Sequence, residues 1–280
     1  MEIRISQNAD LPALTRLWSA CFDDAPATIR LFMERRFPHS FAPAFFEGDR
    51  AVSAVYLLPA HLSIGGLLAP ARYIYAAATL REARGAGLMG RLLAFAQSWA
   101  RETGIDYLFL APATAELAAY YGRKGFSGGF WSSAEKFESD FLTAAPAKIH
   151  PAGAEELHKI AAGYIRNFSP VWALRDYEYL VSDAECGGGV WRLDFSRYSG
   201  TAAVLPKDGG GATVDELFCR EEDVPAALSA IYKVFPAAYY TVRRPAAKNK
   251  NVVCDGMIKA INGRSLPGKN DRPFLTLALR

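Results

Sequence analysis

The sequence has 280 residues, 51% of them hydrophobic and 22% charged, with a formal net charge of +3. About 150 residues per domain is a reasonable prior, so this length suggests two domains, each with enough apolar content for a large core. The small net charge argues against nucleic acid as the main partner. The four cysteines and four histidines are scattered and show no metal-ligand spacing, so we expect no bound metal. We also expect the cysteines to be reduced thiols in a cytoplasmic protein.

The first elements alternate between short strands and amphipathic helices. Residues 2–6 alternate like a strand, and Asp10 is a candidate cap for a helix that ends near Cys21. A second helix is expected over residues 27–36 and a strand over residues 44–46. These elements predict a sheet covered by helices.

Residues 51–71 contain no charged side chain apart from a potentially protonated His61, a length that suggests a membrane span. Pro59, the pair Gly65-Gly66 and Pro70 interrupt it, however, and divide it into two runs of strand length around a turn. The stretch therefore predicts a buried hairpin, and we expect no membrane association.

Residues 81–90 are the most informative part of the chain. They connect an apolar strand pattern over residues 73–80 to a helix pattern over residues 88–102. Gly85 and Gly87 lack a Cβ, so backbone N–H groups at a helix N-terminus can approach an anion closely, and Arg84 adds a permanent cation. The segment predicts a site for a diphosphate-bearing ligand.

Two kinds of ligand compete for this loop. Residues 85–90 match the dinucleotide pattern G-x-G-x-x-G, but four residues separate the strand from the first glycine. The acid about 20 residues further on, Asp106, lies at the wrong end of the next apolar run. A nucleoside-triphosphate loop is excluded because no Gly-Lys-Ser/Thr follows the glycines.

The rest of the chain divides into the end of one domain and a second domain. A strand over residues 107–111, a helix over 115–123 and a closing strand over 130–137 complete the first domain, residues 1–142. Residues 143–152 are rich in Pro and Ala and are expected to form a linker. The second domain, residues 153–280, repeats the order of elements and is expected to end in a strand over 274–279, but it has no counterpart of the glycine loop.

These features resemble the GNAT superfamily of acyl-CoA-dependent N-acyltransferases. Arg84-Gly85-Ala86-Gly87 fits the first four positions of the signature Arg/Gln-x-x-Gly-x-Gly/Ala as that family uses it, although Met89 occupies the sixth position and Gly90 follows one place late. Residues 118–126 resemble the family's Tyr-x-x-x-Gly-Phe segment. The tandem order resembles the enhanced-intracellular-survival acetyltransferases, without the sterol-carrier-like domain that those proteins carry.

The resemblance implies a mixed α/β sheet of the GNAT acyl-CoA-binding type, in two tandem GNAT-like domains of which the second is degenerate. It implies acetyl-CoA as co-substrate and Tyr121 as the general acid that protonates the departing thiolate. It also implies that the following residues hold the cofactor: Ala77, Ala78 and Thr79 along the strand, and Arg84, Gly85, Ala86, Gly87, Leu88, Met89 and Gly90 in the loop.

The function implied is transfer of an acetyl group to a primary amine on a small molecule or peptide, by direct attack. A non-catalytic acyl-CoA sensor and an amino-acyl or peptide-bridge transferase remain alternatives, and a homo-oligomer is possible. Glu47 and Glu116 are weak candidates for a general base.

A basic segment lies toward the C-terminus, and we interpret it as a solvated face rather than as a site for an acidic partner. Its members are Arg243, Arg244, Lys248, Lys250, Lys259, Arg264, Lys269 and Arg272.

Overall fold

The computed structural model describes residues 2–141, 144–185, 187–207, 209–245, 252–268 and 271–276. The chain forms two compact units. Unit 1 contains the described residues of Met1–Gly129 and Gly256–Asp271, and unit 2 contains those of Phe130–Asp255 and Arg272–Leu277.

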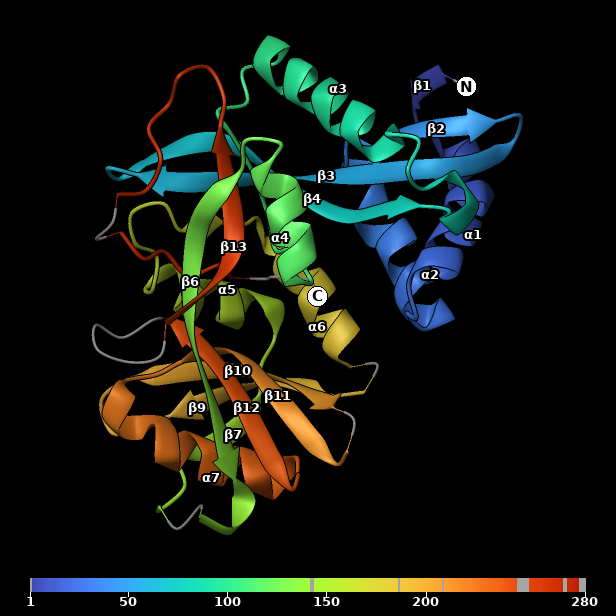
Figure 1. Cartoon of the computed structure of the whole chain (residues 1–280). Coiled ribbons are helices and arrows are strands. Elements are labelled where there is room, and N and C mark those ends of the chain that lie inside the picture. Colours follow the sequence, from blue (N-terminus) through green and yellow to red (C-terminus); the bar gives the residue numbers. More distant parts are fainter. Residues whose placement is uncertain are drawn as a thin grey trace. The chain divides into compact units, whose positions relative to one another are not determined.

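Unit 1 is built around a mixed sheet. Its elements are β1 (Glu2–Ile5), η1 (Asn8–Asp10), α1 (Leu11–Cys21), α2 (Pro26–Arg35), η2 (Phe37–His39), β2 (Pro43–Glu47), β3 (Arg50–Ile64), β4 (Leu67–Thr79), η3 (Arg81–Ala83), α3 (Leu88–Glu102), β5 (Tyr107–Leu110), α4 (Ala115–Gly122) and the end of β13 (Val252–Ala260). The strand order is β1-β2-β3-β4-β5-β13, and of these neighbours only β4 and β5 are parallel among the described residues. Figure 1 shows α3 on one face of this sheet and α1 and α2 on the other.

The core of unit 1 lies on both faces of the sheet, beneath α3 on one face and beneath α1 and α2 on the other. Trp18 and Phe32 pack with ring centroids 4.7 Å apart, and Phe32 meets Tyr56 of β3 at 5.2 Å. The expected hairpin is confirmed as β3 and β4, which turn at Gly65 and Gly66; most of β3 is buried, but Leu67 and Leu68 beside the turn are exposed. None of the helices that the structure describes is long and apolar enough to cross a bilayer.

Unit 2 repeats this plan. Its elements are most of β6 (Ser127–Glu138), η4 (Ser139–Phe141), β7 (Lys148–Pro151), α5 (Ala154–Ala162), β8 (Pro170–Val171), α6 (Leu174–Ala184), β9 (Gly189–Asp194), β10 (Ser199–Lys207), β11 (Gly211–Phe218), η5 (Glu221–Asp223), α7 (Val224–Val234), β12 (Tyr239–Pro245) and the start of β13. Its strand order is β7-β9-β10-β11-β12-β6, with β11 and β12 parallel. Leu228 and Ile231 of α7 pack with Val214 of β11 in a core that is shielded from solvent.

The closing strands of the two units differ from the sequence-based expectation. Residues 130–137 were expected to close the first domain, but they lie in β6, which pairs with β12 of unit 2. Unit 1 is closed instead by the end of β13, where Met257–Ala260 pair with Leu110–Tyr107. The division therefore falls after Gly129 and not after residue 142.

Three further expectations need correction. The segment expected to be a linker, residues 143–152, contains β7, because Lys148–Pro151 pair with β9. The expected final strand does not form at Phe274 and Leu275, which are buried without strand pairing, and residues 277–279 lie outside the described residues. Asp10 does not cap α1, because its carboxylate accepts hydrogen bonds from Arg4 and from the backbone of Gln7.

Candidate active site

The site of interest in unit 1 begins where β4 and β5 part. The two strands pair in parallel only from Ala71–Tyr73 to Tyr107–Phe109. Beyond Tyr73, β4 continues along β3 as far as Thr79, while β5 turns its other edge to β13. Among the strands that the structure describes, none pairs with the remaining part of this edge of β4.

A β-bulge lies just beyond the point of divergence. Ala54 faces Ala78 and Tyr56 faces Tyr75, so Val55 lies opposite the two residues Ala76 and Ala77. Ala76 has φ +45°, a conformation that costs an L-residue roughly 1–2 kcal/mol. Such a bulge leaves a residue outside the ladder and redirects the strand, and bulges are frequent beside active sites.

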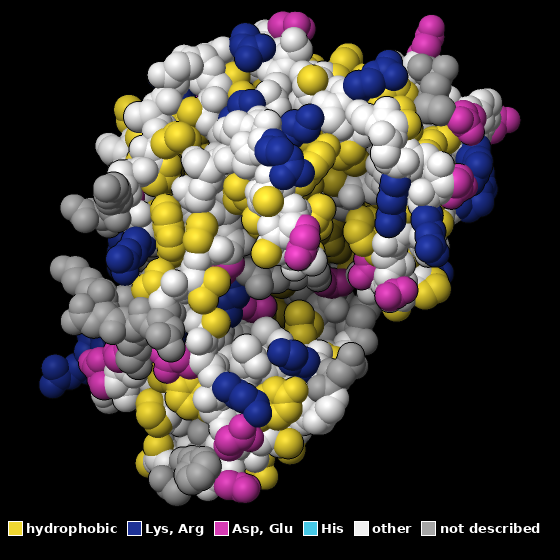
Figure 2. Space-filling model, in the orientation of Figure 1, with side chains coloured by type: hydrophobic (Ala, Val, Ile, Leu, Met, Phe, Trp, Pro, Cys, Tyr) yellow, Lys and Arg dark blue, Asp and Glu magenta, His cyan; other side chains and the backbone are white. Residues whose placement is uncertain are grey.

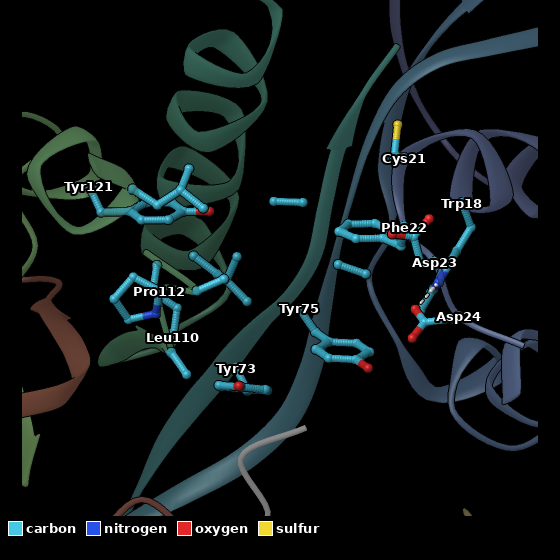
Figure 3. Close-up of a pocket in the computed structure, with 16 residues that line it drawn as sticks. Trp18, Cys21, Phe22, Asp23, Asp24, Tyr73, Tyr75, Leu110, Pro112 and Tyr121 are labelled. Carbon is cyan, nitrogen blue, oxygen red and sulfur yellow. Dashed lines mark hydrogen bonds between the residues drawn. The ribbon is translucent and has the colours of Figure 1, made fainter. Parts of the chain in front are cut away.

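A cavity of about 620 Å³ opens at the bulge. Its walls come from the end of α1 and the loop after it, from β4, from the end of β5 and from α4. The lining residues are Trp18, Cys21, Phe22, Asp23, Asp24, Tyr73, Ile74, Tyr75, Ala76, Ala77, Leu110, Ala111, Pro112, Ala113, Leu117 and Tyr121. Figure 2 shows hydrophobic side chains around the hollow on this face of unit 1, and Figure 3 shows the lining side chains.

Tyr121 provides a hydroxyl on the α4 side of this cavity. The side chain is only 7% exposed, packs edge-on against Phe126, and points its hydroxyl into the cavity (Figure 3). Among the described residues, none forms a hydrogen bond with this hydroxyl. Burial, helped by the neighbouring Tyr120, raises the pKa of Tyr121 to about 12. The phenol therefore keeps its proton throughout the neutral range and remains free to donate it.

The glycine loop has a conformation suited to an anion. Gly85 and Gly87 have φ of +84° and +75°, and a Cβ at either position would meet open space, so backbone geometry and not crowding requires glycine. Gly87 is the N-cap of α3 and has no side chain to occupy the first N–H groups of the helix. Residues 84–87 are exposed. Exposed N–H donors at a helix N-terminus form an anion site.

Arg84 and Cys21 connect this loop to the cavity. The Arg84 Nε donates to the Thr79 carbonyl at 3.1 Å and so fixes the loop to the end of β4. Burial raises the pKa of the Cys21 thiol, and the nearby Arg84 guanidinium opposes that shift. Since Cys21 also lines the cavity, the loop and the cavity belong to one continuous region of unit 1.

The strand residues predicted to contact the cofactor have different surroundings. Ala77 lines the cavity. Ala78 is buried, and its carbonyl accepts from the Ser53 hydroxyl at 2.9 Å; the Thr79 hydroxyl lies 2.7 Å from the same Ser53 oxygen. In the first turn of α3, Leu88 packs inward, while Met89 and Gly90 are half-buried.

Sequence reasoning missed several residues of this region. The bulge residue Ala76 lies in an alanine run whose irregularity no pattern reveals. Lys124 was not singled out, but its Nζ lies 3.1 Å from where a Cβ of Gly90 would be, which adds a cation beside the first turn of α3. Asp23 and Asp24 line the cavity, whereas neither candidate base, Glu47 or Glu116, does.

The His, Cys, Asp and Glu side chains of the described residues form no group that could hold a metal ion.

Comparisons with known proteins bear on the family and the fold. Residues 2–129 match the family model described as "Acetyltransferase (GNAT) domain". The chain as a whole is similar in structure to a conserved protein of unknown function from Enterococcus faecalis, with a TM-score of 0.74, 13% identity, and coverage of 93% of this chain and 72% of that one. The sequence has no significant match among curated proteins.

Two further solved structures are similar over most of the chain. A GCN5-related N-acetyltransferase from Kribbella flavida matches with a TM-score of 0.66 and 18% identity, over 92% of this chain and 72% of that chain. Eis1 from Mycobacterium abscessus matches with a TM-score of 0.68 and 14% identity, over 94% of this chain and 74% of that chain. Residues 2–129 are thus a GNAT acetyltransferase domain, and the chain has the fold of tandem GNAT proteins.

Proposed function

We propose that the protein is an N-acetyltransferase that moves an acetyl group from acetyl-CoA to a primary amine, in unit 1 and in the cytoplasm. The observation that carries the proposal is the combination of a parted strand pair with a bulge, a buried Tyr121 hydroxyl aimed into the cavity, and an exposed glycine loop at a helix N-terminus. The pyrophosphate and the thioester of acetyl-CoA would both bind within unit 1, and the acid Tyr121 would lie in the same unit.

The cofactor would be held largely by backbone groups. The N–H groups of residues 84–90 would bind the pyrophosphate, with the helix dipole of α3 and the Lys124 ammonium adding favourable potential. The pantetheine arm would lie along the edge of β4 that β5 leaves open. The thioester would then reach the bulge at Ala76 and Ala77.

In the reaction, the neutral amine attacks the thioester carbonyl, a C–N bond forms, and the C–S bond breaks. A backbone N–H near the bulge that stabilises the oxyanion would contribute about 3–4 kcal/mol if well aligned. The nitrogen releases its extra proton to water, and the thiolate accepts hydrogen bonding from Tyr121. A thiol has a pKa of about 8.5, below the raised pKa of Tyr121. The proton therefore stays on the Tyr121 oxygen, whose hydroxyl donates a hydrogen bond to the leaving sulfur and so stabilises the negative charge that develops there.

The test is the pair of variants Tyr121→Phe and Tyr120→Phe. Tyr121→Phe removes the hydroxyl in the cavity, and we expect kcat to fall by about 10²-fold or more, with the affinity for acetyl-CoA retained. Tyr120, whose ring centroid is 5.4 Å from that of Tyr121, does not line the cavity and serves as the matched control. Equal rates in both variants would contradict the role of Tyr121, and binding of acetyl-CoA without transfer to any amine would favour a sensor.

A further inference from the structure

The cavity of unit 1 has an acidic end. Among the described residues that line it, Asp23 and Asp24 alone carry a charge, and both are exposed in the loop between α1 and α2. A ligand in this cavity therefore meets two negative charges and no positive one from its lining.

Aromatic rings stand beside these carboxylates. The Trp18 Nε1 donates to the Asp24 Oδ2 at 2.7 Å, which fixes that carboxylate against the indole (Figure 3). The rings of Phe22 and Tyr75 lie 5.8 Å and 5.7 Å from Trp18, centroid to centroid. Aromatic faces and carboxylates both attract an organic cation, and the attraction grows where water is partly excluded.

The opposite side of the cavity is where the acetyl group would be transferred. Figure 3 shows Tyr121 and the two aspartates on opposite sides, with Tyr75 between them in this view. Tyr121 is more than nine-tenths buried and aims its hydroxyl into the space. The bulge residues Ala76 and Ala77, which line the same cavity, are apolar. The end of the cavity at Asp23 and Asp24 therefore suits a cation, and the end at Tyr121 suits the transfer of an acyl group. The apolar space between the two ends suits an apolar chain.

We infer that the acceptor is a diamine, one end of which stays protonated at Asp23 and Asp24 while the other, neutral, end attacks the thioester. This inference rests on the proposed function and names the substrate class of that site. The distal ammonium takes no part in bond making, so the atom and proton balance of the transfer is unchanged. After one transfer the product has only one cationic end, and that end cannot occupy the acidic site and react as well. The inference therefore also predicts that a diamine is acetylated once.

The experiment compares two acceptors of equal chain length, cadaverine and aminopentanol, which differ in carrying an ammonium or a neutral hydroxyl at the far end. We expect kcat/KM for cadaverine to exceed that for aminopentanol by about tenfold or more, as one charge-assisted contact would provide. In the double variant Asp23→Asn/Asp24→Asn this ratio should fall to about one, since asparagine keeps the size of the side chain and loses its charge. Mass spectrometry should find monoacetylcadaverine as the product.

A matched control removes two charges elsewhere. Glu34→Gln/Glu102→Gln changes two exposed acids of unit 1 that do not line the cavity, and the selectivity ratio should stay at its wild-type value. A ratio near one in the wild type would overturn the inference, as would an equal loss for both acceptors in the Asp23→Asn/Asp24→Asn variant. Either result leaves the N-acetyltransferase proposal standing.

Calorimetric titration of cadaverine into the protein saturated with CoA separates the two proposals. Binding that is lost in Asp23→Asn/Asp24→Asn supports the ammonium site even if no acetyl transfer is detected, in which case the proposed function fails alone. Binding that is unchanged in that variant, or no binding of cadaverine at all, overturns the inference.

Discussion

The two units share one plan up to the place where a ligand would bind. In unit 1, β4 pairs in parallel with β5 over three residue pairs and then bulges at Ala76, with φ +45°. In unit 2, β11 pairs in parallel with β12 over three residue pairs and then bulges at Glu216, with φ +52°. Because both sheets have a strained bulge at the same place, the bulge is a feature of the fold. A bulge alone therefore does not create a ligand-binding site.

The units differ first in the loop that follows. In unit 1, η3 ends at Ala83, and residues 84–87 intervene before α3 begins at Leu88. In unit 2, η5 ends at Asp223 and α7 begins at Val224, with Pro225 in its first turn. Unit 2 therefore lacks the residues whose backbone would present N–H groups to a pyrophosphate.

They differ next in what lies between the parted strands. The residue after the parallel pairing is Leu110 in β5, which lines the cavity, and Arg243 in β12, which is 5% exposed. The Arg243 Nε lies 2.7 Å from Asp255, its Nη2 donates to the Leu275 carbonyl at 2.9 Å, and its Nη1 lies 3.8 Å from Asp215. Burial alone would lower the pKa of Arg243, but the carboxylates of Asp255 and Asp215 together have the larger effect, so the pKa is raised. An ion-paired arginine occupies in unit 2 the position that borders a cavity in unit 1.

The largest effect is expected from Arg243→Met. The substitution keeps an apolar stem but leaves Asp255 and Asp215 without their buried cation, which should cost about 3–5 kcal/mol of the free energy of unfolding. Urea denaturation measures the change, and Arg243→Met/Asp255→Asn, which removes charge from both sides, should recover part of it. A loss below about 1 kcal/mol would mean that the ion pair behaves as an exposed one.

A smaller effect is expected from Gly87→Ala in the loop that unit 2 lacks. An alanine at φ +75° costs roughly 1–2 kcal/mol, so the loop should relax and the affinity for acetyl-CoA should fall by about tenfold. Gly66→Ala is the matched control, because Gly66 has φ +83° in the β3–β4 turn, away from the cavity, with open space around it. Equal affinity in both variants would show that the loop does not hold the cofactor.

The smallest effect concerns the alkaline side of the pH profile. Because the pKa of Tyr121 is raised to about 12, its acidic form persists as the pH rises, and activity should not fall through its ionisation until the pH approaches that value. We expect log kcat/KM to rise with pH as the acceptor amine loses its proton, with the same shape in Tyr121→Phe. A descending limb near neutral pH that disappears in Tyr121→Phe would contradict the raised pKa.

Local chemistry made much of unit 1 predictable. The helix expected over residues 88–102 is α3, and the strand and helix expected after it differ from β5 and α4 by one residue each. Gly65-Gly66, Gly85 and Gly87 mark turns whose positive φ only glycine adopts readily. The fold of the tandem GNAT proteins was implied by the resemblance of residues 84–90 and 118–126 to the family's motifs, and it was confirmed.

The pairing of distant strands could not be predicted in the same way. The pattern of residues 130–137 indicates a strand but does not show which strand it pairs with. The strand β13 was not predicted, because Cys254, Asp255 and Lys259 interrupt the alternation of apolar and polar residues that is typical of a strand. Arg243 and Arg244 were expected on a solvated face and are buried, because Asp255 and Glu221 pair with them. Lys248, Lys250 and Lys269 of that basic segment lie outside the described residues.

The acidic end of the cavity could not be predicted from the sequence either. Asp23 and Asp24 follow a helix like many surface acids, and only the fold brings them to the same cavity as Tyr121. The signal that could have found them is the position of α1, whose Trp18 and Cys21 share that cavity.

The stoichiometry of acetyl-CoA binding tests the comparison between the units most directly. Calorimetric titration of the whole chain, with NAD as the parallel control, should give one acetyl-CoA site per chain, strongly weakened by Gly87→Ala, and no binding of NAD. Two sites per chain, a single site indifferent to Gly87→Ala, or binding of NAD alone would contradict the assignment of the cofactor to the glycine loop of unit 1.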